Sequence, residues 1–184
     1  MSKPTPEEVE AGLRHKDWRV RVQWAKRADW GPPTPEQVER GLQDENPWVR
    51  SAWVERTDWG PPTPEQIKRG LADSTRLQWL KRKDWTLTYT QAKDLLAKSP
   101  SWVQAEVLKR TDWGSPDEDV CMIVIRSGAP YLHEALLARG DWWPSEEIII
   151  NMMQHHDVKI ARLWQMWYVR QQSDELLQLD CPSG

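Results

Sequence analysis

Apolar residues recur at helical spacing through most of the chain, in short segments separated by turn residues. The stretch from residue 34 to 59, TPEQVERGLQDENPWVRSAWVERTDW, holds two such segments: Val38 and Leu42 lie four residues apart, and so do Val49 and Trp53. Side chains four residues apart share one face of an α-helix. The stretch therefore predicts two short amphipathic helices joined by a turn.

The same sequence signals for the start and end of a helix recur at several places in the chain. Thr5, Thr34 and Thr63 are each followed by Pro and Glu. Thr is a good N-cap, Pro suits the first helical position, and an acidic residue is favoured in the first turn by the helix dipole. The sequence Gly31-Pro32-Pro33 cannot continue a helix. These signals predict a helical hairpin of about 29 residues that repeats.

A second mark of the repeat is the Arg-x-Asp-Trp motif, whose Asp stands at positions 29, 58, 84, 112 and 141, in steps of 29, 26, 28 and 29 residues. A repeat unit cannot bury its apolar face alone, so neighbours in sequence are expected to stack. We therefore predict an all-α fold, a right-handed α-solenoid of about six two-helix, HEAT-like repeats in a single domain, 1–184. The predicted repeats are 5–30, 34–59, 63–85, 88–113, 116–142 and 144–172, followed by a polar tail at 173–184.

The third repeat is three residues shorter than the second between its Gly and its Trp, Gly70 to Trp79 against Gly41 to Trp53. This predicts a tighter turn between its helices. The last repeat lacks the Arg-x-Asp-Trp motif, as expected of a terminal cap.

Composition narrows the class of protein. The chain has 184 residues, 39% hydrophobic and 29% charged, with a net charge of -3, which argues against a general binder of polyanions. No apolar run reaches the roughly 18 to 20 residues of a membrane span, and the first residues lack the apolar segment of a signal peptide. Two cysteines, Cys121 and Cys181, are too few for a disulfide framework. We expect a cytoplasmic protein.

The repeated sequence motifs resemble those of a known family. Val20-Arg21-x-x-Trp24-Ala25, Val49-Arg50-x-x-Trp53-Val54 and Thr-Pro-Glu-x-Val/Ile-x-x-Gly-Leu are similar to the leucine-rich repeat variant family of bacteria, related in shape to HEAT and armadillo repeats. The resemblance covers Thr5 to about Thr111 well and the rest loosely. It implies stacked pairs of short helices and no shared chemistry. The chain departs from it in placing Trp at a core position and in lacking a cysteine cluster, so no iron–sulfur centre is implied.

Tryptophan and arginine form columns along the repeats: the chain has 14 Trp and no Phe. We interpret Trp24, Trp53 and Trp79 as core residues, and the Trp of each Arg-x-Asp-Trp motif as part of a ladder between repeats. The motif arginine recurs in all five copies, as a structural residue would. A second arginine column, eight residues before the motif Asp, is present in the first three repeats only. We expect the residues that bind a partner to be Arg21, Arg50, Arg76, Trp48 and Trp102.

Signals for catalysis are poor. The chain lacks a glycine-rich phosphate loop, a Gly-x-Ser-x-Gly elbow and a His-Glu-x-x-His motif. Side chains of adjacent residues on a helix point about 100° apart, so His155-His156-Asp157 is interpreted as an exposed turn and not as a metal site. Cys121, within an apolar segment, is expected to be an inert core thiol. We therefore expect no enzyme activity, no cofactor and no metal.

Two classes of function are consistent with this sequence. The first is a non-catalytic scaffold, such as an adaptor, an immunity protein or an inhibitor, that grips another protein through the groove or edge of its repeats. The alternative is a nucleic-acid-binding HEAT-like protein of the DNA-glycosylase type. The Trp and Arg columns and acidic residues such as Asp58 favour this alternative. Every such Asp belongs to a repeating motif, whereas a catalytic residue should break the repeat. The sequence favours the protein-binding scaffold.

Overall fold

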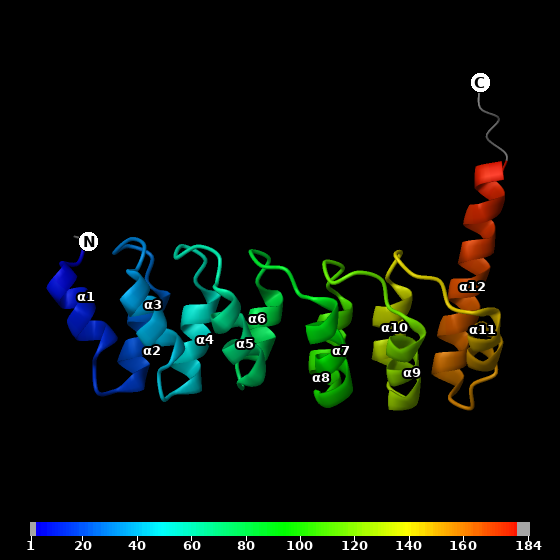
Figure 1. Ribbon diagram of the computed structural model, residues 1–184, viewed down its shortest axis with the longest axis horizontal. Coiled ribbons are helices and arrows are strands. Elements are labelled where there is room, and N and C mark those ends of the chain that lie inside the picture. Colours follow the sequence, from blue (N-terminus) through cyan, green and yellow to red (C-terminus); the bar gives the residue numbers. More distant parts are fainter. Residues whose placement is uncertain (1–2, 180–184) are drawn as a thin grey trace, which may run out of the picture. The chain divides into compact units, whose positions relative to one another are not determined.

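The computed structural model describes residues 3–179, with side chains up to residue 173. Every regular element in this part of the chain is an α-helix, which confirms the all-α class (Figure 1). The twelve helices found there are α1 (Pro6–Leu13), α2 (Trp18–Lys26), α3 (Pro35–Leu42), α4 (Pro47–Glu55), α5 (Pro64–Ala72), α6 (Arg76–Lys81), α7 (Tyr89–Lys98), α8 (Ser101–Leu108), α9 (Glu118–Ser127), α10 (Pro130–Leu137), α11 (Glu146–Met153) and α12 (Val158–Leu179).

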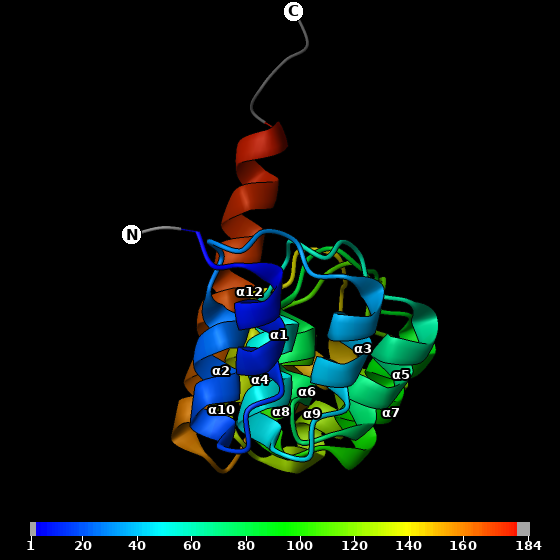
Figure 2. The ribbon, with the colours of Figure 1, turned by 90° about the vertical axis from the view of Figure 1, so that its left-hand side faces the viewer.

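The helices fall into two compact units, and the boundary follows directly on the third Arg-x-Asp-Trp motif. Unit 1 ends at Thr86 and contains α1–α6; unit 2 begins at Leu87 and contains α7–α12. In unit 1 the helices pair in chain order, and the second helices of the pairs, α2, α4 and α6, pack against one another in turn. Figure 2 shows α3 and α5 on one side of this unit and α2 and α4 on the other. In unit 2, α8, α10 and α12 form the corresponding row of second helices.

The first helices begin where the sequence predicts. In α1, α3, α5 and α7 the Thr N-cap accepts a hydrogen bond from the backbone N–H three residues on, and the Glu or Gln at that position accepts one from the Thr N–H. This capping box satisfies two backbone donors that a helix N-terminus otherwise leaves open. The predicted boundaries follow from this local chemistry.

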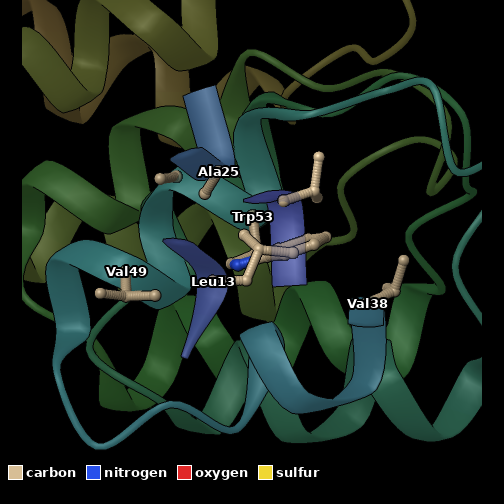
Figure 3. Close-up of a cluster of buried hydrophobic side chains, with 7 residues drawn as sticks. Leu13, Ala25, Val38, Val49 and Trp53 are labelled. Carbon is tan, nitrogen blue, oxygen red and sulfur yellow. The ribbon is translucent and has the colours of Figure 1, made fainter. Parts of the chain in front are cut away.

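Trp53 lies at the centre of the core of unit 1, among Leu13, Ala25, Val38 and Val49 (Figure 3). The indole fits because Gly41, on the neighbouring helix α3, has no side chain: a Cβ atom there would lie 2.2 Å from the Trp53 ring. The same close approach pairs Gly12 with Trp24 and Gly70 with Trp79. The glycine of each Gly-Leu motif thus makes room for the tryptophan of the next helix. Trp53 and Trp79 are buried core residues as predicted, whereas Trp24 is only partly buried.

The three residues that the third repeat lacks, compared with the second, are missing mainly from its second helix and not from the turn. Helix α6 has six residues, whereas α2 and α4 have nine. The turn that precedes α6 shortens only to residues 73–75, compared with 43–46 before α4. The tighter turn is present, but most of the deletion removes the first part of the second helix.

The last helix extends further than the repeat length predicts. Helix α12 continues to Leu179, so the first seven residues of the predicted polar tail, 173–179, are helical, and 180–184 lie outside the described residues. In Figure 1 the C-terminal part of α12 extends beyond α11, its partner in the last hairpin. Within residues 3–179, none of the helices has the length and apolar character needed to cross a membrane.

Candidate partner-binding surface

The Arg-x-Asp-Trp motif forms the joints between repeats. Arg56 donates from Nε and Nη2 to the Asp58 carboxylate, and its guanidinium lies 4.2 Å above the ring of Trp30 in the preceding repeat. Its Nη1 donates to the carbonyl oxygens of Ala25, at 2.9 Å, and Arg27, at 2.7 Å, and Nη2 to that of Gly31, at 3.1 Å. One side chain therefore caps the C-terminal end of the preceding second helix and stacks on its tryptophan.

The joint recurs inside both units. Arg82 donates to the carbonyls of Val54, Arg56 and Gly60 and lies 4.1 Å above Trp59. Arg139 donates to those of Leu108, Arg110 and Gly114 and lies 4.2 Å above Trp113. Each motif tryptophan in turn donates from Nε1 to the carbonyl oxygen six residues before it. The ladder expected between repeats is present, and the motif arginines belong to it.

The arginines of the second column also make contacts between repeats. Arg21 is buried and donates to both oxygens of Asp44 at 2.8 Å, while Arg50 donates to both oxygens of Asp73 at 2.7 and 2.9 Å. Each arginine thus reaches a carboxylate in the following repeat. Although burial of Asp73 opposes its ionisation, the hydrogen bonds from Arg50 hold the pKa of Asp73 below its ordinary value.

Arg76 does not belong with Arg21 and Arg50. Because α6 begins late, Arg76 is its first residue, and it donates to the backbone carbonyls of Asp73, at 3.0 Å, and Ala72, at 3.4 Å. It therefore caps the C-terminus of α5 in its own hairpin. All three arginines thus use guanidinium donors in hydrogen bonds within the fold.

Two of the predicted binding residues are exposed, and a third aromatic residue joins them. The exposed fractions are 66% for Trp48, 52% for Trp102 and 45% for Tyr131. Each stands ten residues before the Asp of its Arg-x-Asp-Trp motif, at the second position of the second helix. Tyr131 was not among the residues expected from the sequence, although its spacing from the motif Asp is the same as that of Trp48 and Trp102.

A groove between α8 and α10 in unit 2 follows the two rows of residues that begin at Trp102 and Tyr131. On α8, Ala105 and Lys109 come three and seven residues after Trp102; on α10, Glu134, Ala135 and Ala138 come three, four and seven after Tyr131, so each row lies on one helix face. The groove has a volume of about 560 Å³, and its lining residues are Ala105, Leu108, Lys109, Thr111, Tyr131, Glu134, Ala135, Ala138, Arg139 and Gly140. Its floor is built mainly from small side chains.

The corresponding groove of unit 1, between α2 and α4, is smaller, at about 400 Å³, and is crossed by an ion pair. Lys26 on α2 and Glu55 on α4 approach to 3.6 Å, each three residues before its motif Asp. At the same positions unit 2 has Lys109 and Ala138, and Lys109 turns to Glu106 on its own helix, at 2.7 Å. Replacement of Glu by Ala removes the bridge, and the α8–α10 groove is open.

The ionisable groups singled out in the sequence lie elsewhere in unit 2. Burial raises the pKa of the Cys121 thiol to about 12, so this thiol stays protonated at neutral pH. His155, His156 and Asp157 form the turn between α11 and α12, where the Nδ1 atom of His155 accepts a hydrogen bond from the backbone N–H of Asp157 at 3.0 Å. Cys181 lies outside the described residues.

No protein-family profile, curated protein or solved structure matches this chain.

Proposed function

We propose that this protein is a non-catalytic scaffold that binds another protein, and that the α8–α10 groove, with Trp102 and Tyr131 beside it, receives an apolar side chain of that partner. The observation that carries the proposal is the contrast between the two grooves: the one in unit 1 is bridged by Lys26 and Glu55, and the one in unit 2 is open and floored by small residues. A groove lined by small residues and by the exposed ring of Tyr131 offers the anchor pocket and aromatic contact that dominate protein interfaces.

The use of the other tryptophans supports this surface. Trp53, Trp79, Trp85, Trp113, Trp142 and Trp164 are buried, and each motif indole donates its N–H within its own repeat. Trp48 and Trp102 instead expose most or half of their surface, as does Trp143, whose ring contacts that of Trp167. Leaving a tryptophan in water forgoes roughly 1.5–3 kcal/mol of burial, by the values for large apolar side chains. An aromatic residue at a constant exposed position is therefore better explained by contact with a partner than by the fold.

The arginines weigh against the nucleic-acid alternative. A DNA-binding protein neutralises phosphates with Lys and Arg side chains that are available at its surface. Here Arg21, Arg50, Arg56, Arg82 and Arg139 all donate to carboxylates of the protein. The α8–α10 groove is lined by two basic residues, Lys109 and Arg139, and one acidic residue, Glu134, and the two basic side chains are paired with Glu106 and Asp141. Such a surface has no excess of positive charge to attract a phosphate backbone.

The joints within each unit also support the predicted architecture, a right-handed α-solenoid of six hairpins similar to the leucine-rich repeat variant family. Arg56 and Arg82 join successive hairpins in unit 1, and Arg139 does so in unit 2. A stack of this kind presents its row of second helices as one surface along which a partner can lie.

The proposal is tested by restoring in unit 2 the glutamate that unit 1 carries. Ala138→Glu places a carboxylate at the position of Glu55, opposite Lys109, and should fill the α8–α10 groove while leaving the fold intact, because Ala138 is exposed. Ala97→Glu, at an exposed position of α7 in the same unit, is the matched control. Tagged wild type and both variants are used to capture proteins from an extract of the producing organism. We expect a protein retained by wild type and by Ala97→Glu and lost with Ala138→Glu.

Two results would contradict the proposal. One is equal capture of the same protein by all three forms, which would place its binding elsewhere. The other is tight binding of a fluorescent DNA duplex whose affinity falls steeply with salt, which would favour the nucleic-acid alternative.

A further inference from the structure

His133 on α10 is a buried histidine with one unsatisfied nitrogen. Its side chain and that of Trp164 on α12 are both fully buried, and Trp164 Nε1 donates to His133 Nδ1 at 3.1 Å. A nitrogen that accepts carries no proton, so the neutral ring holds its proton on Nε2. His133 Nε2 has no hydrogen-bond partner among the described residues. The imidazole is therefore held neutral, in one tautomer, by a single bond to the neighbouring repeat.

The position of His133 in its repeat shows what this bond replaces. It stands eight residues before the motif Asp, where the first two repeats have Arg21 and Arg50. Those arginines reach carboxylates of the following repeat, Asp44 and Asp73. His133 also reaches the following repeat, but through a neutral ring and an indole. The same joint is thus an ion pair in unit 1 and an uncharged hydrogen bond between α10 and α12.

Mild acid changes the charge at only one of these two kinds of joint. An arginine stays charged at every physiological pH, whereas a histidine gains a proton in mildly acidic solution. A proton added to His133 Nδ1 turns that nitrogen into a donor that faces the N–H of Trp164, so the hydrogen bond is lost. The new positive charge would also be buried, which is unfavourable without a paired anion.

The surrounding charges do not supply such an anion at close range. His155 lies in the turn before α12, with its ring centroid 6.3 Å from that of His133. Burial, with the nearby His155, lowers the pKa of His133 to about 4, and the more distant attraction of Asp157 opposes the shift. On the helices packed against α10, Lys109 pairs with Glu106 at the end of α8. On α9 and on α12 as far as residue 173 the charged side chains are exposed, namely Glu118, Asp119, Arg126, Lys159, Arg162 and Arg170.

We propose that His133 makes the contact between α10 and α12 a pH-sensitive joint, closed while the imidazole is neutral and opened in mildly acidic solution by protonation of Nδ1. The proton comes from solvent, and the bond lost is Trp164 Nε1–H to His133 Nδ1. When α12 separates, His133 returns to the ordinary pKa of a solvated histidine, about 6.5. Because the pKa in the closed form is lower, the joint is fully stabilised above about pH 6.5 and loses that stability as the pH falls toward 4. Between pH 7 and 5 the equilibrium constant for opening should rise about 20-fold.

The test follows the indole N–H signals of the tryptophans by NMR as the pH falls from 7.5 to 4.5. The Trp164 signal, identified by its absence in Trp164→Phe, should broaden or shift to a solvent-exposed position in wild type, while that of Trp59 in unit 1 stays unchanged. In His133→Asn, whose amide oxygen can accept from Trp164 and does not titrate, the Trp164 signal should persist throughout. His156→Asn, in the exposed turn, is the matched control and should behave as wild type.

Either of two results would overturn the proposal. The first is a Trp164 signal that remains unchanged in wild type while the ring nitrogens of His133 titrate. The second is a transition at the same pH in His133→Asn and in wild type. If His133→Asn does not fold, the first measurement decides alone, because it needs only the wild-type protein.

Discussion

Arg56 and Arg27 occupy the same position of the Arg-x-Asp-Trp motif, and their comparison isolates the joint between repeats. Both donate from Nε and Nη2 to the Asp two residues later and stack over a tryptophan, at 4.2 Å for Arg56 over Trp30 and 4.4 Å for Arg27 over Trp24. Only Arg56 has a preceding hairpin, and it donates to three of that hairpin's carbonyl oxygens. We predict that Arg56→Ala destabilises the protein far more than Arg27→Ala.

The magnitude follows from what the truncation leaves behind. A hydrogen bond to a charged group contributes about 1.5–3 kcal/mol, and loss of one partner of a buried charged network costs about 3–5 kcal/mol. Asp58 is partly exposed and can be solvated, so most of the loss comes from the three carbonyls and from the stacking on Trp30, worth about 0.5–2 kcal/mol. We expect a decrease of about 3–5 kcal/mol in the free energy of unfolding.

Urea unfolding followed by tryptophan fluorescence, with a global fit of the wild type and both alanine variants, measures this difference. Arg56→Lys adds a useful third variant, because a single ammonium cannot reproduce the five directed donors of a guanidinium and should recover only part of the loss. Similar losses for Arg56→Ala and Arg27→Ala would refute the reasoning, since they would assign the stabilisation to the local Arg–Asp fork that both share.

Two further predictions concern the packing and the second arginine column. Gly41→Ala should lower stability by about 1–3 kcal/mol, because its Cβ would lie 2.2 Å from the Trp53 ring, and the added substitution Trp53→Val should recover part of the loss; thermal unfolding that is unaffected by Gly41→Ala would contradict the packing. Arg50→Glu should destabilise unit 1 by setting two carboxylates against each other at Asp73, and Asp73→Arg in the same chain should restore part of the stability; a melting temperature unchanged by Arg50→Glu would return Arg50 to the role of a surface contact.

Local chemistry made the helices predictable. The signals that set helix boundaries act within a few residues: the Thr-Pro-Glu motifs, the glycine–proline turns and the apolar spacing. Helices α1, α3 and α5 begin where these signals predict. The packing of glycine against tryptophan also has a trace in the sequence. In the fourth repeat Leu95 stands at the position of Gly41 and Val107 at that of Trp53, so the small residue becomes larger where the large residue becomes smaller. That exchange becomes interpretable only once the structure brings the two helices together.

The role of the second arginine column could not be predicted from where it stops. Arg21 and Arg50 each bind a carboxylate 23 residues further on, Asp44 and Asp73, and a residue's offset within its repeat does not say which way its side chain reaches. The residue 23 positions after Arg76 is Ser99, so this third arginine of the column has no carboxylate at the spacing that Arg21 and Arg50 use.

The α8–α10 groove lacks the ion pair that crosses the corresponding groove of unit 1, and the sequence of a single repeat does not show this difference. Lys26 and Glu55 lie 29 residues apart in sequence and meet across two helices. The substitution that opens the corresponding groove in unit 2, Ala138 in place of Glu, is an ordinary alanine on the surface of a helix. Its effect on the groove becomes visible only when the two grooves are compared.

Site-specific photocrosslinking tests the central claim most directly, because it reports contact at one residue in the intact protein. A photoreactive phenylalanine analogue replaces Tyr131 beside the α8–α10 groove or, as a control, Ala97 on α7, and the protein is irradiated in the producing cells. We predict a crosslink to one defined protein from position 131, absent from position 97 and abolished by Ala138→Glu in the same chain. Crosslinking to nucleic acid from position 131, or an undiminished protein crosslink in the presence of Ala138→Glu, would contradict the assignment of the groove as the partner-binding site.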